Sequence, residues 1–120
     1  MAEDLINFRL STYANEVAEK FVETGYFDYA TTVAKFALGY TIKNYFHEFN
    51  PATYQIPDAG GSNYNVGSFD SDGQLAALIK ALYPQTTTPY QYMRALMIFG
   101  LTKLGEKWER EGFQSVGAFL

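Results

Sequence analysis

The segment TPYQYMRALMIFGLTKLGEKWEREG, residues 88–112, decides the fold that we predict for this chain. Its apolar side chains recur at intervals of three and four residues, which is the spacing of one face of an α-helix. Thr88 followed by Pro89 is typical of a helix start, and Gly112 favours a helix end. The sequence therefore predicts one long helix here, with an apolar stripe made of Met93, Leu96, Met97, Leu101, Leu104 and Trp108.

The same spacing predicts three further helices upstream. Each is preceded by a Ser, Thr or Asp, whose side chain can accept hydrogen bonds from the first free amides of a helix. The expected limits are Ser11 or Thr12 to Gly25, Asp28 to about Tyr45, and Asp70 or Asp72 to Tyr83.

A short strand is expected before the first helix, because residues 6–11 alternate apolar and polar side chains with the period of a β-strand. One set of side chains should point to the core and the other to solvent. The inward set is Ile6, Phe8 and Leu10, and the outward set is Asn7, Arg9 and Ser11.

The sequence contains two similar halves, about residues 6–47 and 67–112, which align without a gap at an offset of 61 residues. Gly39 aligns with Gly100, and a glycine inside a helix costs about 1 kcal/mol relative to alanine. We expect both glycines to mark a close crossing of the two long helices. The linking residues 48–66 contain prolines and a Gly60-Gly61 pair, which predicts a long ordered loop or a loose hairpin.

Composition limits the class of protein. A chain of 120 residues that is 48% hydrophobic and 18% aromatic is expected to form one domain with a single core. It has no cysteine, which excludes a disulfide framework. The start MAEDLINFRL lacks the features of a signal peptide, and no stretch is apolar enough to span a membrane, so we expect a cytoplasmic protein. The net charge of −4 argues against a general nucleic-acid binder.

No catalytic or metal-binding pattern is present, and we expect neither an enzyme nor a cofactor. His47 is the only histidine, so no multi-histidine metal site can form. Asp70-Ser71-Asp72-Gly73 resembles the opening of a calcium loop but lacks the closing Glu, and helix capping explains it. Gly60-Gly61-Ser62 lacks the lysine of a phosphate-binding loop.

Both long helices are apolar on more than one side, whereas a surface helix of a monomer needs one apolar face. We therefore expect a homo-oligomer, either a dimer or a tetramer. The side chains predicted for its interface are Phe8, Leu38, Ile42, Tyr45, Ile98 and Phe99.

The order strand, helix, Gly25-Tyr26 turn and helix resembles a ribbon-helix-helix unit. The whole chain, from about Phe8 to Glu106, resembles the DndE family of DNA sulfur-modification (phosphorothioation) proteins. The similarity includes Val66-Gly67-Ser68-Phe69 before the third helix and the end of the fourth helix, Phe99-Gly100-Leu101-Thr102-Lys103-Leu104. The resemblance implies a small, helical, non-enzymatic accessory protein that self-associates and contacts DNA through lysines and arginines.

The strand supplies the sharpest DNA hypothesis. Two such strands, one from each subunit, would form a ribbon that enters the major groove, where Arg and Asn recognise guanine and adenine edges. The alternative is a structural or adaptor oligomer that binds a protein partner and not DNA. The candidate DNA-binding residues are Asn7, Arg9, Lys20, Lys35, Lys43 and Arg94.

Overall fold

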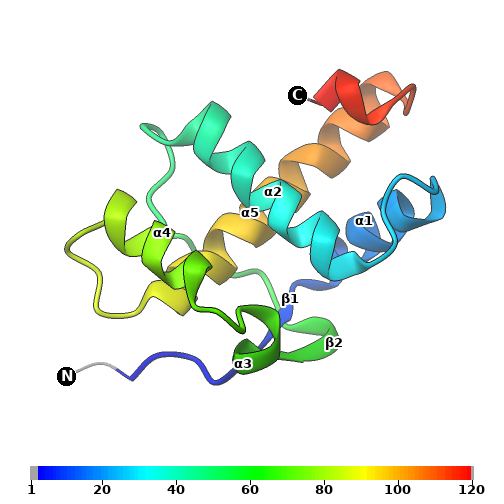
Figure 1. Ribbon diagram of the computed structural model, residues 1–120. Coiled ribbons are helices and arrows are strands. Elements are labelled where there is room, and N and C mark those ends of the chain that lie inside the picture. Colours follow the sequence, from blue (N-terminus) through cyan, green and yellow to red (C-terminus); the bar gives the residue numbers. More distant parts are fainter. Residues whose placement is uncertain (1–2, 120) are drawn as a thin grey trace.

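Two long helices cross at the centre of the protein, and the other elements pack around this crossing (Figure 1). The computed structural model describes residues 3–119, which are mostly helical with a short N-terminal strand, as the sequence predicts. This strand belongs to a two-stranded antiparallel sheet. The elements are β1 (Asn7–Leu10), α1 (Thr12–Glu23), α2 (Ala30–Tyr45), β2 (Gly60–Asn65), α3 (Val66–Phe69), α4 (Gln74–Leu82), α5 (Pro89–Glu111) and a final 3₁₀ turn, η1 (Val116–Phe119).

The crossing joins α2 and α5, and Gly100 allows it. A Cβ atom on Gly100 would lie 2.2 Å from the carbonyl oxygen of Ala37, so only glycine fits. The buried hydroxyl of Thr41 donates across the crossing to the carbonyl oxygen of Leu96, 2.8 Å away. The prediction of a close crossing is wrong for Gly39. This residue is exposed, and a Cβ atom added to it would meet no other side chain or helix within 4 Å.

Helix limits follow the predicted start and stop residues in most cases. The Ser11 hydroxyl accepts from the amide of Ala14 at 3.1 Å, and α1 ends before Gly25, whose φ is +85°. Gly112, with φ +74°, ends α5. These are local interactions, which is why the sequence pattern locates them.

Two capping predictions need correction. Asp28 does not cap α2, because Tyr29 is the N-cap residue and no side chain bonds the first amides. At α5 the helix starts at Pro89 as predicted, but the Thr88 side chain makes no capping bond. Asp4 serves instead, accepting from the amides of Tyr90 at 2.8 Å and Gln91 at 3.0 Å.

The partner of β1 lies within the same chain. β1 pairs antiparallel with β2, which forms inside the segment 48–66 predicted as a loop or loose hairpin. In the second half, α3 occupies the place where a second copy of the strand is expected, so the similarity of the halves extends to the helices α4 and α5.

Alternation in β1 is confirmed for four of the six predicted side chains. Phe8 and Leu10 are buried, whereas Asn7 and Arg9 are exposed. Two predictions are wrong. Ile6 is 75% exposed because the chain bends there, before the strand begins, and Ser11 is buried because its hydroxyl turns back to cap α1.

An aromatic cluster around the buried ring of Phe21 fixes the end of the molecule that carries both α1 and the C-terminal segment. The centroid of the Phe21 ring lies 5.1 Å from that of Trp108 and 5.2 Å from that of Phe119, both edge to face. The apolar tail therefore docks on its own chain. Within residues 3–119, no helix is both long and apolar enough to cross a membrane.

Candidate nucleic-acid interface

The outer face of the β1–β2 ribbon carries Asn7, Arg9 and Asn65. Asn7 lies opposite Asn65 in the antiparallel register, so their side chains share a face, and Arg9 follows two residues along β1. The register shifts between Phe8 and Leu10, so Asn63 lies in an irregular part of β2 beside this face. All four residues are exposed.

Intramolecular bonds already hold part of this face. The Arg9 guanidinium donates to the carbonyl oxygen of Gly61 through Nη1. The Asn65 amide donates to Oδ1 of Asn7 at 3.3 Å, and its own Oδ1 accepts from the backbone amide of Ser68 at 3.1 Å, which caps α3. The side chain of Asn63 makes no hydrogen bond to a residue in the range 3–119, so its amide is open to solvent or to a ligand.

The inner face of the ribbon is rigidly packed. The Phe8 ring contacts Tyr64 at a centroid distance of 5.4 Å and Phe69 at 5.1 Å. Behind the strand, the Nε atom of Arg94 donates to the carbonyl oxygen of Arg9 at 2.7 Å. Because the inner face is packed, the ribbon backbone that carries the outer side chains is held rigid. A rigid scaffold favours specific binding of a ligand by these side chains.

The predicted cations do not converge. The structure brings together Asn7, Arg9 and Arg94, but the lysines lie elsewhere. Lys20 covers the ring of Trp108 at 4.8 Å, and Lys35 on α2 covers the ring of Phe69 at 4.7 Å. Lys43 is exposed near the end of α2. The two strand residues and Arg94 remain as one candidate site.

Asn63 and Asn65 are not among the predicted site residues, although both are exposed polar residues of the ribbon. A signal for them exists in the printed sequence, because Asn63-Tyr64-Asn65 alternates polar, aromatic and polar. The pattern does not tell which strand pairs with β1, so these asparagines could not be placed beside Arg9.

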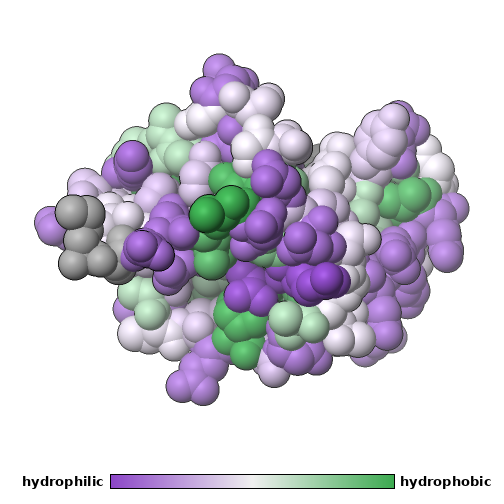
Figure 2. Space-filling model, turned by 90° about the horizontal axis from the view of Figure 1, so that it is seen from below, coloured by the Kyte–Doolittle hydropathy of each residue, from purple (hydrophilic) through white to green (hydrophobic). Residues whose placement is uncertain are grey.

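The predicted oligomer interface is wrong at three of its six residues. Phe8, Leu38 and Ile98 are at most 3% exposed, because one copy of the chain covers them. Ile42, Tyr45 and Phe99 are partly exposed. Figure 2 shows the face on which the ribbon lies, where hydrophilic side chains predominate and hydrophobic ones form small separate areas.

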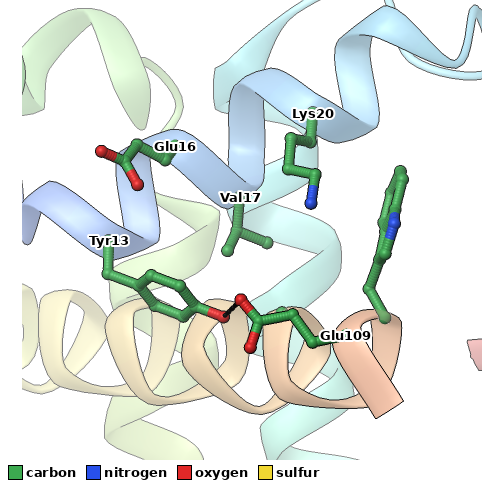
Figure 3. A pocket seen from close by; sticks show the side chains of 7 residues that line it. Tyr13, Glu16, Val17, Lys20 and Glu109 are labelled. Carbon is green, nitrogen blue, oxygen red and sulfur yellow. Dashed lines mark hydrogen bonds between the residues drawn. The ribbon is translucent and has the colours of Figure 1, made fainter. Parts of the chain in front are cut away.

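A second polar feature is the hollow of about 80 Å³ between α1 and α5 (Figure 3). Tyr13 donates to Oε1 of Glu109 at 3.1 Å. Burial, followed by this bond to a carboxylate, raises the pKa of Tyr13 to about 12. Tyr13 therefore stays protonated at neutral pH and acts as a donor that joins the two helices, not as a base.

Asp70 is the one buried carboxylate among residues 3–119, and it serves the start of α4. It accepts from the amides of Leu75 at 3.0 Å and Ala76 at 3.1 Å, and from the Tyr90 hydroxyl at 2.8 Å. Burial alone would raise the pKa of Asp70, but these bonds and the charge of Lys35 outweigh it and lower the pKa. Asp72 accepts from the amide of Gln74, so both aspartates bond amides in the first turn of α4, although the N-cap residue is Gly73 and neither aspartate.

Comparison with known proteins adds nothing to this geometry. No family model, curated protein or solved structure matches the chain. Among residues 3–119, no group of three acidic or histidine side chains is arranged to hold a metal ion. The exposed ribbon face is therefore the site on which a functional argument can be built.

Proposed function

We propose that this chain is a non-catalytic accessory protein that contacts duplex DNA through the outer face of the β1–β2 ribbon, in a DNA sulfur-modification system of the DndE type. The observation that carries the proposal is the presence of Asn7, Arg9 and Asn65 on one exposed face of a two-stranded ribbon, with the exposed Asn63 beside them. The major groove of B-DNA, about 12 Å wide, admits such a ribbon. Arginine pairs with guanine edges and asparagine with adenine edges.

The net charge of −4 is compatible with this mode of binding if base edges, rather than many phosphates, provide the contacts. Arg9 and Arg94 are the two cations at the ribbon. With about two phosphate contacts, raising salt fourfold should weaken binding about 12-fold, far less than for a basic DNA-binding protein. The proposal includes self-association through the partly exposed Ile42, Tyr45 and Phe99, because two ribbons on one duplex would raise the overall affinity.

Asn63 offers the cleanest test, since it is exposed and bonds no residue in the described range. Asn63→Asp adds one negative charge to the ribbon face without removing an intramolecular bond. The matched control is Gln114→Glu, which makes the same change of charge at an exposed site between α5 and η1, at the other end of the molecule (Figure 1).

Binding would be measured by fluorescence anisotropy with a labelled duplex of about 20 base pairs at about 50 mM salt. We expect Asn63→Asp to weaken binding about tenfold or more, because its carboxylate faces acceptor-rich base edges and phosphates. Gln114→Glu should bind as the wild type does. Absence of wild-type binding at micromolar protein, or equal loss in both variants, would contradict the proposal.

A protein-binding adaptor is the second candidate. The turn between α1 and α2 exposes Tyr26 at 63% and Tyr29 at 69%, and tyrosine is enriched in protein interfaces. This alternative predicts that the wild type ignores DNA in the anisotropy assay.

A further inference from the structure

A hollow of about 180 Å³ lies between the N-terminal segment, the loop after α2 and the first half of α5. Leu5, Tyr54 and Ile56 give it apolar walls, and Gln91 and Arg94 are its polar residues. A cavity of similar size, about 150 Å³, holds a benzene molecule in another protein. The space therefore suits one small organic ligand.

Arg94 enters this hollow with its charge uncompensated. Its Nε atom is committed to the carbonyl oxygen of Arg9. Within residues 3–119, its Nη1 and Nη2 atoms make no hydrogen bond, and Arg94 forms no salt bridge. Burial lowers the pKa of Arg94, and no opposing effect of a nearby carboxylate accompanies it.

The Nη atoms of Arg94 have no partner among the described residues, and they are accessible to water. They can therefore donate to an anion that presents two acceptor oxygens to the free end of the guanidinium.

The neighbouring N-terminal segment carries two carboxylates, Glu3 and Asp4, and neither forms a salt bridge with Arg94. The start of α5 holds Asp4. The two Asp4 oxygens accept from the backbone amides of Tyr90 and Gln91 at the first turn of α5. The start of α5 thus stabilises the negative charge of the Asp4 carboxylate. It leaves the end of Arg94 for another acceptor.

We propose that this hollow binds a small organic monocarboxylate with a ring-sized apolar body. The carboxylate accepts from Nη1 and Nη2 of Arg94, and the apolar body contacts Leu5, Tyr54 and Ile56. A carboxylate fits better than a larger anion because the planar end of the guanidinium matches its two oxygens. Arg94 is also one of the two cations assigned to the ribbon, so a bound carboxylate would compete with a DNA phosphate for its guanidinium.

The test uses the full chain without DNA and follows the methyl signals of Leu5, Ile56 and Ala95 by NMR during titration with benzoate. Benzamide, which has the same ring but no charge, is the matched ligand. We expect saturable shifts with benzoate and binding about tenfold or more weaker with benzamide, since hydrogen bonds to a charged partner are the stronger ones.

Two variants separate the pocket from general effects. Arg94→Gln removes the charge, and Ala52→Phe fills the hollow from an exposed position in its wall. Both should abolish benzoate binding, and if Arg94→Gln fails to fold, Ala52→Phe decides alone. Benzoate shifts that do not saturate, equal binding of benzamide, or unchanged binding by Ala52→Phe would each overturn the proposal.

Discussion

Gly39 and Gly100 hold equivalent positions in the two halves of the chain, 61 residues apart, but their surroundings are opposite. Both lie inside long helices, so replacement by alanine should gain the same helix propensity, up to about 1 kcal/mol. A Cβ atom at residue 100 would lie 2.2 Å from the carbonyl oxygen of Ala37 and 2.5 Å from Oγ1 of Thr41. At residue 39 it would meet nothing within 4 Å. The pair of variants therefore isolates the cost of crowding the crossing.

The magnitude follows from the geometry. Real Cβ atoms essentially never approach another heavy atom closer than 3.0 Å, so the Ala37 carbonyl must retreat by at least 0.8 Å, the difference between 3.0 and 2.2. The obstacle is backbone, which places the cost of overpacking near the upper end of the usual range, about 3 kcal/mol. After the gain in propensity, Gly100→Ala should lose about 2 kcal/mol of unfolding free energy. Gly39→Ala should gain about 0.5–1 kcal/mol.

Urea unfolding followed by far-ultraviolet circular dichroism measures both values, provided that the slope of free energy against urea is the same for the three proteins. The two variants should then differ by about 3 kcal/mol, with the wild type between them. If Gly100→Ala is as stable as the wild type, the close approach of α2 and α5 does not require a glycine at residue 100. If Gly39→Ala is destabilised as strongly, the open surroundings assigned to Gly39 are wrong.

Two further predictions use the same unfolding assay. Thr41→Val should lose about 1 kcal/mol more than Thr102→Val, because the Thr41 hydroxyl is buried and bonds Leu96 on the other helix, whereas the Thr102 hydroxyl is only partly buried and donates to Ile98 in its own helix. Equal losses would contradict a role for the Thr41 bond in joining α2 to α5. The pKa of Asp70 is lower in the folded protein than its usual value, so the folded state is stabilised above about pH 4 and loses this stabilisation as the pH falls through the folded-state pKa. Asp70→Asn should be less stable than the wild type at neutral pH, and its stability should depend less steeply on pH below about 5. If its stability falls with pH as steeply as that of the wild type, other carboxylates cause the acid sensitivity.

The helices could be predicted from the sequence because their limits depend on neighbours in the chain. Ser11, Gly25 and Gly112 act within four residues of the helix ends that they mark. The apolar stripe of α5 is also local information, and its members from Met93 to Leu104 are buried as its period indicates. Local patterns therefore determine the fold class without reference to the rest of the molecule.

Pairings between distant segments could not be predicted in this way. Nothing in the period of β1 identifies β2 as its partner, because strand pairing depends on where the intervening helices bring the chain. The same reason explains why Gly39 was wrongly predicted to lie at the close crossing. A glycine in a helix does not indicate on which face of that helix a second helix will pack. This reason also explains why Asn63 and Asn65 were not assigned to the candidate site.

One copy of the chain buries the central residues of both long helices, whereas self-association stays a prediction. The loops supply aromatic side chains that act as core. Phe49 stacks on Phe99 at a centroid distance of 4.3 Å, and Tyr54 contacts the same ring edge to face at 5.7 Å. Phe119 covers the other end of the core at Phe21. Leu38 and Ile98 are buried within one copy of the chain, so the fold does not need a second copy to bury its central apolar residues. A ligand can instead bind groups that the fold leaves without a protein partner. Among the described residues, these groups include the side chain of Asn63 and the Nη atoms of Arg94.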